Sequence, residues 1–336
     1  MPSTAPPRPP GRLADGVDAL LEWTVGASFT RLGLLARRRL EAWPPFEGTP
    51  LAGKVVVMSG ATSGLGLEAA RTFARLGATL ELIARNPTKA EATRAALVAE
   101  TGNAAVRFLR ADTGDLDAIR RVADELLARH QRVDVLIHNA GALEDLRRVS
   151  AQGVEETVAS QVLGPFLLTG LLVPALTAAA PSRVLWVSSG GMYVEPLRVD
   201  RLELPEGHYD GVTAYARAKR AQVTLAVLWA QRLAADGVVV HALHPGWADT
   251  PGVQRSLPRF RRALRPFLRT ADEGADTLVW LAVDGGAPLR STGRFWLDRR
   301  ERPLHRLAST RRSDTAEERA RLWAWCEEKT GLAFSR

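Results

Sequence analysis

A tyrosine and a lysine lie four positions apart in the stretch TAYARAKRAQ, residues 213–222. Helical periodicity places Tyr215 and Lys219 on one face of a helix. An ammonium beside a phenol favours the ionised phenol, so the pair could move a proton to or from a substrate oxygen. The alternative is that Tyr215 only packs in the core, because this spacing is frequent by chance.

A second group with chemical potential ends the apolar run RVLWVSSGGM. A hydroxyl at the carboxyl end of a strand can hydrogen-bond a substrate oxygen and orient it. Ser188 and Ser189 are the candidates for this role, although a serine at a strand end means little by itself.

The elements that must position these groups alternate between short apolar strands and longer amphipathic helices. This pattern predicts an α/β fold with a doubly wound (Rossmann), mostly parallel, seven-stranded sheet and helices on both faces. We expect an N-terminal extension with an amphipathic helix over residues 1–50, a catalytic domain over 51–300, and a C-terminal tail with a helix over 301–336. The expected strands are 54–60, 78–84, 105–112, 132–141, 182–189, 237–246 and 293–297.

The composition suits such a domain and excludes some site types. The chain has 336 residues, of which 46% are hydrophobic, and can therefore bury a substantial core. Its single cysteine, Cys326, rules out an internal disulfide and a cysteine-based zinc cluster, and no metal site is expected. A lone cysteine fits a reducing compartment, so we expect a cytoplasmic protein.

Lys and Arg outnumber Asp and Glu by 45 to 37, and part of this excess gathers in residues 251–270. That segment has no acidic residue, which predicts a cationic surface. An anionic partner and a merely solvated helix face both fit. No nucleic-acid-binding motif accompanies the charge, so nucleic acid is not an expected partner. The arginines are Arg255, Arg259, Arg261, Arg262, Arg265 and Arg269.

The N-terminal region holds two further features. Residues 1–12 are rich in proline and lack the apolar run of a secretory signal, so we expect a flexible tail. Residues 17–39 carry an apolar stripe at helical spacing followed by Arg37, Arg38 and Arg39. This helix could lie on a membrane surface with the arginines toward anionic headgroups, or dock on its own domain or on a second subunit. Peripheral membrane contact through 17–39 and 255–269 is one hypothesis.

Three glycines mark a cofactor site. Gly60, Gly64 and Gly66 follow the first strand and open a helix. Without a Cβ atom the backbone can turn tightly and approach a pyrophosphate, whose charge meets free amides and the positive end of the helix dipole. The position in a βαβ unit predicts a dinucleotide cofactor.

The spacing from Ser59 to Gly66 resembles the Thr-Gly-x-x-x-Gly-x-Gly turn of the short-chain dehydrogenase/reductases, with serine in place of threonine. Stretches such as VSSGGM and HPGWADTPGV resemble one branch of that family, the member 12 dehydrogenase/reductases. The resemblance covers most of residues 50–300 and implies a homo-oligomeric oxidoreductase acting on a small molecule. The turn residues it implies at the cofactor are Ser59, Gly60, Ser63, Gly64, Leu65 and Gly66.

The end of the second strand bears on which nicotinamide cofactor binds. An acidic residue there would bind both ribose hydroxyls of NAD, but the chain has Ala84 and Arg85. A guanidinium can pair with the 2′-phosphate of NADP, so we expect NADP(H) in preference to NAD(H). The alternative is an arginine that is simply exposed. Asp112 could accept a bond from the adenine amino group, as the family's acid does, or cap the next helix.

The resemblance extends to two later motifs. HNAG after the fourth strand matches the family's Asn-Asn-Ala-Gly, whose small residues let the ribose and nicotinamide lie against the chain. His138 departs from it and is expected to be an ordinary buried histidine. The second motif matches the family's Pro-Gly turn and its following threonine. These motifs place Asn139, Ala140, Gly141, Pro245, Gly246 and Thr250 at the cofactor.

In the resembling family the Tyr-x-x-x-Lys pair transfers the proton and the lysine also binds the nicotinamide ribose. This implies Tyr215 as acid/base, Lys219 as the group that tunes it, and Ser189 as the polariser. The family's relay asparagine aligns with Gln161, whose amide lies one methylene further out. We therefore expect an NADP(H)-dependent enzyme interconverting a carbonyl and an alcohol, with a dinucleotide-binding regulatory or scaffold protein of little turnover as the alternative.

Two segments are expected to set specificity. Residues 190–211 form an insertion whose apolar side chains could line a pocket for an oily or lipid-like substrate, or pack on themselves. Residues 251–270 alternate apolar side chains with arginines and could form a mobile lid, with Pro258 and Pro266 shortening or bending any helix.

Overall fold

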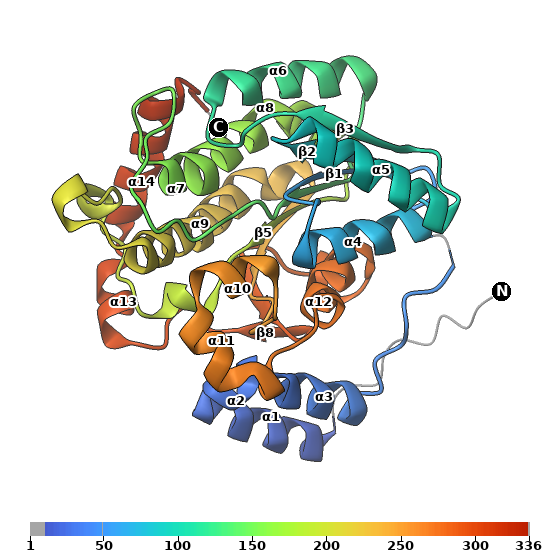
Figure 1. Ribbon diagram of the computed structural model, residues 1–336, viewed down its shortest axis with the longest axis vertical. Coiled ribbons are helices and arrows are strands. Elements are labelled where there is room, and N and C mark those ends of the chain that lie inside the picture. The colour runs from blue at the N-terminus through green and yellow to red at the C-terminus, as the bar shows by residue number, and fades with distance from the viewer. Residues whose placement is uncertain (1–10, 49, 335–336) are drawn as a thin grey trace.

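The computed structural model describes residues 11–48 and 50–334. Residues 1–10, where most of the flexible tail was expected, lie outside this part. The described chain forms one eight-stranded sheet in the order β3-β2-β1-β4-β5-β6-β7-β8, parallel except for β8 (Figure 1). The strands are β1 Val55–Ser59, β2 Thr79–Ala84, β3 Val106–Arg110, β4 Val135–His138, β5 Ser182–Val187, β6 Val238–Leu243, β7 Arg294–Leu297 and β8 Arg300–Arg302.

The seven expected strands are all present, but the expected strand count was wrong by one. The missed strand, β8, has the sequence Arg-Glu-Arg and lacks the apolar pattern by which strands are recognised. It pairs antiparallel with β7 through a two-residue turn. Asp298 and Arg299 in that turn adopt φ values of 54° and 56°, as both central residues of a tight hairpin do.

Helices cover both faces because the strands are apolar on both sides. Val55 and Val57 of β1 point into the core under α6, α8 and α9, whereas Val56 and Met58 point into the core under α4, α5 and α12. The main helices of these layers are α4 Gly64–Arg75, α5 Pro87–Thr101, α6 Leu116–Arg129, α7 Glu156–Val158, α8 Gly164–Ala178, α9 Gly211–Leu233 and α12 Ala271–Val283.

The remaining helices belong to segments added around the sheet. At the lower edge of Figure 1, α1, α2 and α3 lie beside α11. The C-terminal helix α14 packs on α9 and contributes Trp323 and Cys326 to the core. These helices are α1 Arg12–Thr24, α2 Gly26–Phe29, α3 Arg31–Leu40, α10 Pro251–Ser256, α11 Pro258–Leu264, α13 Ala308–Ser313 and α14 Ala316–Thr330.

The N-terminal stripe does not form the single helix that was expected. Val25, with φ 50°, separates α1 from α2, and Thr30 separates α2 from α3. The three helices fold onto the sheet end and bury Phe29 and Leu34. Arg37 is also buried and pairs with Asp18 and Asp298, so the expectation that it faces lipid headgroups was wrong.

The cationic segment likewise divides into surface and interior. Arg255, Arg259, Arg262 and Arg265 are exposed, while Arg261 pairs with Asp249. Arg269 is buried against Asp298 and cannot belong to a cationic surface. Both helices of the segment begin with a proline at the first helical position, where the missing N–H costs no hydrogen bond.

One helical stretch, Glu156–Ala178, is long and apolar enough to span a membrane by length and composition. Seventy-eight per cent of its most apolar window is buried inside the protein, so it serves as a core helix. Near its N-terminal end lies a π-helical turn, Ala159–Leu163, which contains Gln161.

Candidate active site

The predicted site residues lie where four neighbouring parallel strands end. The strands β1, β4, β5 and β6 are adjacent in the sheet, so their carboxyl ends form one edge. Ser59, Asn139, Ser189 and Pro245 end or follow these strands in turn. In doubly wound sheets, ligands bind at this edge.

The glycine turn rests on the segment that follows β4. The Ser59 hydroxyl accepts hydrogen bonds from the backbone N–H groups of Asn139 (3.2 Å) and Ala140 (3.1 Å). In return, the Asn139 amide donates to the Gly60 carbonyl at 2.8 Å. Gly60 has φ 71°, and a Cβ there would lie 2.7 Å from the Ala140 backbone. The side chains of Ser59 and Asn139 therefore hold the glycine turn against the segment that follows β4.

The other two glycines, Gly64 and Gly66, also allow close contacts in this turn. A Cβ on Gly66 would lie 2.1 Å from the Gly60 carbonyl oxygen, and one on Gly64 would lie 3.3 Å from the Thr250 side chain. Ser63 precedes α4 without capping it, so the first amides of this helix keep no side-chain acceptor from it. The turn thus fits a pyrophosphate, which these amides and the helix dipole would hold.

Leu65 follows Gly64 in the glycine turn, and Gly246 belongs to the Pro-Gly turn; both lie in tight packing with neighbouring elements. Leu65 packs against Gly274 of α12, where a Cβ would lie 2.3 Å from Cδ2 of Leu65. Gly246 has φ 77°, and a Cβ there would overlap the Arg269 guanidinium. Arg269 also donates to the Pro245 carbonyl at 3.3 Å. The buried Arg269 therefore supports the Pro-Gly turn from the interior of the protein.

The adenosine end is open and charged. Arg85 is exposed after β2 and lies 3.8 Å from the carboxylates of both Asp112 and Glu156. A cavity of about 720 Å³ begins here, and two further arginines that sequence reasoning missed, Arg110 and Arg121, also line it. Arg110 could have been found from its position at the end of β3, because β3 pairs with the strand that Arg85 follows.

Asp112 has a local partner in this region. Its carboxylate accepts a hydrogen bond from the Gly114 N–H at 2.9 Å, while Asp115 caps α6. The alternative that Asp112 caps the helix was therefore wrong. Its side chain keeps 41% of its surface exposed, so it remains reachable from the cavity.

Tyr215 and Lys219 lie on one face of α9, as predicted. The ammonium of Lys219 lies 5.1 Å from the centre of the Tyr215 ring and donates to the Val187 carbonyl at 2.9 Å. Burial lowers the pKa of Lys219 to about 7. Burial also raises the pKa of Tyr215 to about 12, with the Ser189 hydroxyl acting in the lowering direction. The direction of this shift is opposite to the one predicted from the neighbouring cation, because burial disfavours the charged phenolate.

The two serines after β5 have different surroundings. Ser188 is buried and donates to the Lys219 carbonyl at 3.0 Å, so it ties β5 to α9. Ser189 lies at the surface of the site, where its hydroxyl accepts a hydrogen bond from the Gly191 N–H at 3.4 Å and contacts Tyr215. The two hydroxyls that could touch a substrate oxygen therefore lie together.

The side chains of Gln161 and Lys219 both lie close to Gly141. Its amide donates to the Ala142 carbonyl at 2.7 Å, and its buried Oε1 has no hydrogen-bond partner among the described residues. A Cβ on Gly141 would lie 3.0 Å from this oxygen and 3.3 Å from the Lys219 ammonium. The π-helical turn around Gln161 keeps a local distortion in this helix, a feature frequent at functional sites.

Comparison with known proteins agrees with this geometry. A family model for short chain dehydrogenases matches residues 54–200. The chain is 36% identical over 268 residues to the human dehydrogenase/reductase SDR family member 12, covering 80% of this chain and 84% of that protein. The chain is a short-chain dehydrogenase/reductase. It is also 35% identical over 287 residues to human retinol dehydrogenase 12, covering 84% of this chain and 88% of that protein.

Solved structures show the same fold. A crystal structure of an uncharacterised protein from Mycobacterium paratuberculosis has a TM-score of 0.66 and 29% identity, and covers 85% of this chain and 96% of that chain. A short chain dehydrogenase from Burkholderia cenocepacia in complex with NADP has a TM-score of 0.60 and 20% identity, and covers 73% of this chain and 96% of that chain.

Two departures of this short-chain dehydrogenase/reductase from its family pattern have structural explanations. His138 is buried, bonds the Thr169 hydroxyl at 2.8 Å and packs on Trp186. Burial lowers its pKa to about 3, so it is an uncharged core residue, as predicted. The insertion 190–211 packs inward, with Tyr193, Leu197 and Leu202 in the core. These side chains pack into the core of the domain and not only on one another, and a pocket-lining role for the insertion stays a prediction.

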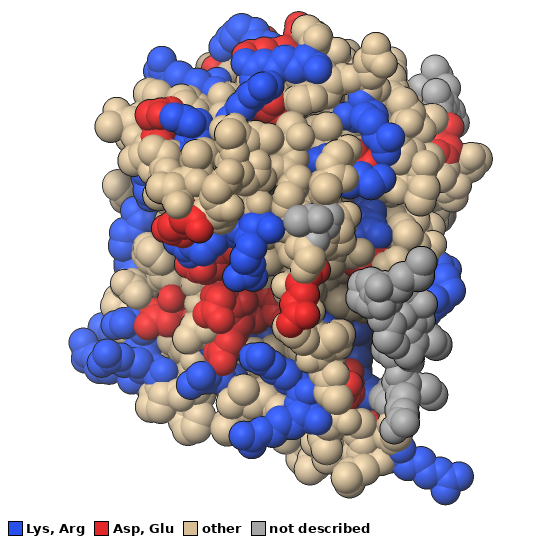
Figure 2. Space-filling view, turned by 90° about the vertical axis from the view of Figure 1, so that its right-hand side faces the viewer, with Lys and Arg blue, Asp and Glu red and all other residues tan. Residues whose placement is uncertain are grey.

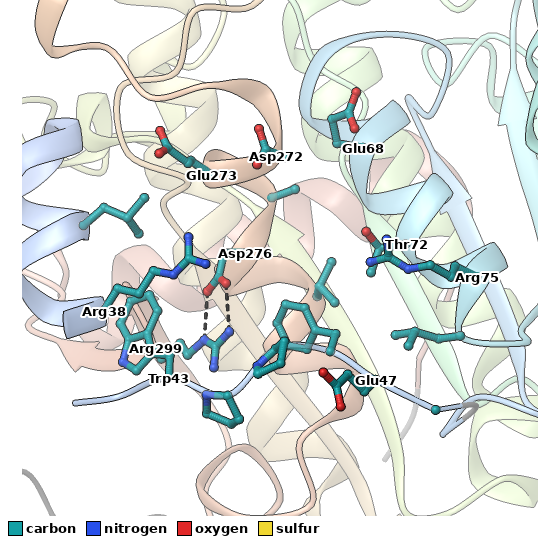
Figure 3. A pocket seen from close by; sticks show the side chains of 18 residues that line it. Arg38, Trp43, Glu47, Glu68, Thr72, Arg75, Asp272, Glu273, Asp276 and Arg299 are labelled. Atoms are coloured by element: carbon teal, nitrogen blue, oxygen red, sulfur yellow. Dashed lines mark hydrogen bonds and ion pairs between the residues drawn. The ribbon is translucent and has the colours of Figure 1, made fainter. Parts of the chain in front are cut away.

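A second cavity of this dehydrogenase/reductase, of about 760 Å³, lies between α3, residues 43–48, α4 and α12. None of the predicted catalytic or cofactor residues lines it. Figure 3 shows Arg299 paired with Asp276 at its centre, and the guanidinium stacks on Trp43 and Phe46 at 4.7 Å. Figure 2 shows acidic side chains gathered in the middle of this side of the molecule, with Lys and Arg around them.

Proposed function

We propose that this short-chain dehydrogenase/reductase is an NADP(H)-dependent oxidoreductase that interconverts a carbonyl and an alcohol on a hydrophobic small molecule. The observation that carries the proposal is the convergence of Ser189, Tyr215 and Lys219 beside Gly141 at the strand ends. A proton-transfer group has no use in a protein that only binds a dinucleotide.

In this mechanism, bound nicotinamide supplies or accepts the hydride. Ser189 donates a hydrogen bond to the substrate oxygen and orients it. Tyr215, whose pKa burial raises to about 12, holds its proton in the free protein and donates it to the oxygen during reduction. Lys219, whose pKa burial lowers to about 7, can then return a proton toward the phenol near neutral pH.

Gln161 is the proposed relay residue behind Lys219. Its unpartnered, buried Oε1 faces the same glycine as the ammonium, and a buried acceptor is costly unless a donor reaches it. The extra methylene relative to asparagine is accommodated by the bond from its amide to Ala142.

NADP(H) is favoured over NAD(H) because of the charge at the adenosine end. Arg85, Arg110 and Arg121 border one cavity, and among the described residues Asp112 and Asp115 are the acids that line it. A 2′-phosphate accepts charge-assisted bonds from guanidinium groups, whereas the ribose hydroxyls of NAD gain less from them.

A hydrophobic substrate is favoured by exposed apolar side chains on the segments that carry the proposed catalytic groups. Val194 follows the Ser189 turn and is 61% exposed, and Val212 precedes Tyr215 and is 51% exposed. The α10–α11 segment, the proposed lid, contacts the segment that follows Gly141. There the Ser256 hydroxyl donates to the Leu143 carbonyl at 3.0 Å. Its Phe260 packs on Trp247 behind the Pro-Gly turn.

The decisive experiment is NADPH oxidation by the full chain against a panel of hydrophobic aldehydes and ketones, with Tyr215→Phe as the paired variant. We expect turnover by the unsubstituted protein and a loss of about 100-fold to 10,000-fold in kcat for Tyr215→Phe. Cofactor affinity, measured by NADPH fluorescence, should stay unchanged.

The second candidate function is a dinucleotide-binding regulatory or scaffold protein. Gln161 favours it, because moving a relay group by one methylene can slow catalysis greatly. NADPH binding without any Tyr215-dependent turnover across the panel would favour this function over the first.

We also propose a cytoplasmic protein that contacts membranes peripherally. Leu20 and Trp23 on α1 and Leu32 on α3 are exposed, Trp23 by 83%, and the exposed arginines of α11 lie at the same end of the molecule (Figure 1). Apolar side chains with flanking cations suit an anionic bilayer surface. A Leu20→Ser/Trp23→Ser variant should lose co-sedimentation with phosphatidylserine vesicles. Equal sedimentation of both proteins, or of neither, would contradict this proposal.

The family resemblance further favours a homo-oligomer. Light scattering coupled to size exclusion would reveal a mass above the 36.5 kDa of one chain, and a monomer at micromolar concentration would contradict it.

A further inference from the structure

The N-terminal helices reach the active site through one side chain. Phe29, the last residue of α2, is buried, although the residues matched by the family model begin only at residue 54. A Cβ built on Gly190 would lie 2.7 Å from Cε2 of the Phe29 ring. Gly190 directly follows Ser189, so the ring lies against the backbone of the turn that carries the proposed polarising hydroxyl.

The same ring also contacts the other turn of the chemical end. Phe29 packs edge-on against His244 at 4.4 Å and against Trp247 at 5.7 Å, the residues that flank Pro245 and Gly246. The Trp247 N–H donates to the Phe29 carbonyl at 2.8 Å. Phe29 thus touches both turns that surround the reacting groups.

A buried charge cluster holds Phe29 in place. Arg269 donates to the carbonyls of Ser28 (3.0 Å) and Phe29 (3.1 Å), and Arg37 donates to the Ser28 carbonyl at 3.1 Å. Both guanidinium groups pair with Asp298, which is fully buried in the β7–β8 turn. Because Arg269 also bonds Pro245, the cluster joins α2, the Pro-Gly turn and the sheet edge.

We propose that Phe29 is a positioning residue of the active site, whose ring fixes the Ser189–Gly190 turn against the Pro-Gly turn. The N-terminal helices are then a working wall of the site as well as a surface segment. The inference rests on the proposed oxidoreductase function for its kinetic consequence, but its structural consequence is independent of turnover.

A double-mutant cycle between Phe29→Ala and Gly190→Ala tests it in the full chain. Gly190 has no positive φ, so alanine is excluded there by the Phe29 ring and not by backbone strain. Each single variant should lower kcat about 10-fold to 100-fold, since small displacements of reacting groups have effects of that size. In the double variant the new methyl group occupies space that the ring has left, so the two losses should not multiply.

Leu34→Ala is the matched control. Leu34 is equally buried in the N-terminal helices, in α3, but is not among the atoms near Gly190. It should lower thermal stability as Phe29→Ala does, leave kcat per folded molecule within about threefold, and show no coupling to Gly190→Ala. NADPH affinity should change less than kcat in every variant, because the pyrophosphate turn around Gly60 is untouched.

Coupling of threefold or more between Phe29 and Gly190 in kcat supports the proposal, and smaller coupling overturns it. If the unsubstituted protein has no turnover, the proposed function fails while this inference is decided by hydrogen exchange. Faster amide exchange in residues 189–193 of Phe29→Ala than of Leu34→Ala supports it, and equal exchange overturns it.

Discussion

The two ends of the cofactor site are built in different ways. The adenosine end is assembled from segments that follow neighbouring strands, and its guanidinium groups, such as that of Arg85, remain exposed. The chemical end is enclosed by segments from far apart in the chain, where Phe29, Arg269 and Asp298 meet beneath Gly246. One end is open and charged, and the other is buried and fixed.

The difference follows from the chemistry at each end of the site. A phosphate is held by charge and by free amides, which tolerate exposure and some motion. Proton transfer needs hydroxyls held within a few tenths of an ångström, which only packing on all sides can provide. Substitutions at the chemical end should therefore disturb both folding and rate, whereas those at the adenosine end should change only cofactor choice.

The largest effect is expected from Asp298→Asn. Burial opposes ionisation of this carboxylate, but Arg269 and Arg37 keep its pKa below the ordinary value. Asparagine keeps the shape and tolerates the φ of 54°, but it removes the acidic partner of the buried Arg269 and one of the acidic partners of the buried Arg37, which keeps Asp18. The free energy of unfolding should fall by about 3–5 kcal/mol in denaturant titrations.

Glu301→Gln is the control for Asp298, because Glu301 forms an exposed pair with Arg294 in the same hairpin. Its substitution should change the free energy of unfolding by less than about 1 kcal/mol. Equal effects of the two substitutions would remove the distinction between the buried end and the exposed surface.

The next effect is expected from Arg85→Ala at the adenosine end. Loss of a charge-assisted bond to the 2′-phosphate should reduce the preference for NADPH over NADH by about 10-fold to 100-fold, measured as the ratio of dissociation constants. The melting temperature should stay the same because Arg85 is exposed. An unchanged preference would defeat the assignment, and Arg94→Ala on α5, where Arg94 pairs with Glu91, should change neither quantity.

The smallest effect, counted per pH unit, is a pH dependence of the free energy of unfolding caused by Lys219. Its pKa falls from 10.5 to about 7 on burial, so between these values the unfolded chain binds more protons than the folded chain. Stability should therefore rise with pH over this window, by at most about 1.4 kcal/mol per pH unit. The Lys219→Met variant should lack this slope, whereas the exposed Lys89→Met should retain it; a slope shared by all three would place its origin elsewhere.

Much of the site was predictable from sequence because its parts are local. The glycine turn, HNAG, Ser189 and the Tyr215–Lys219 pair each lie within a few residues of a strand or on one helix turn, so spacing alone defines their geometry. Parallel strand order then brings the strand ends together. The roles of these residues in catalysis remain predictions that the experiments above address.

Apolar periodicity and glycine spacing act over short distances, so the amino-acid sequence alone predicted the sheet, its two layers of helices and the edge at which a dinucleotide would bind. Only the tertiary structure decided that Arg37 and Arg269 are buried partners of Asp298 and that Phe29 lies against Gly190. The contacts of Arg37 with Asp298 and of Phe29 with Gly190 join residues more than 150 positions apart. An arginine in a basic run reads as surface unless its distant carboxylate is known, since a buried charge is stable only with its partner in place.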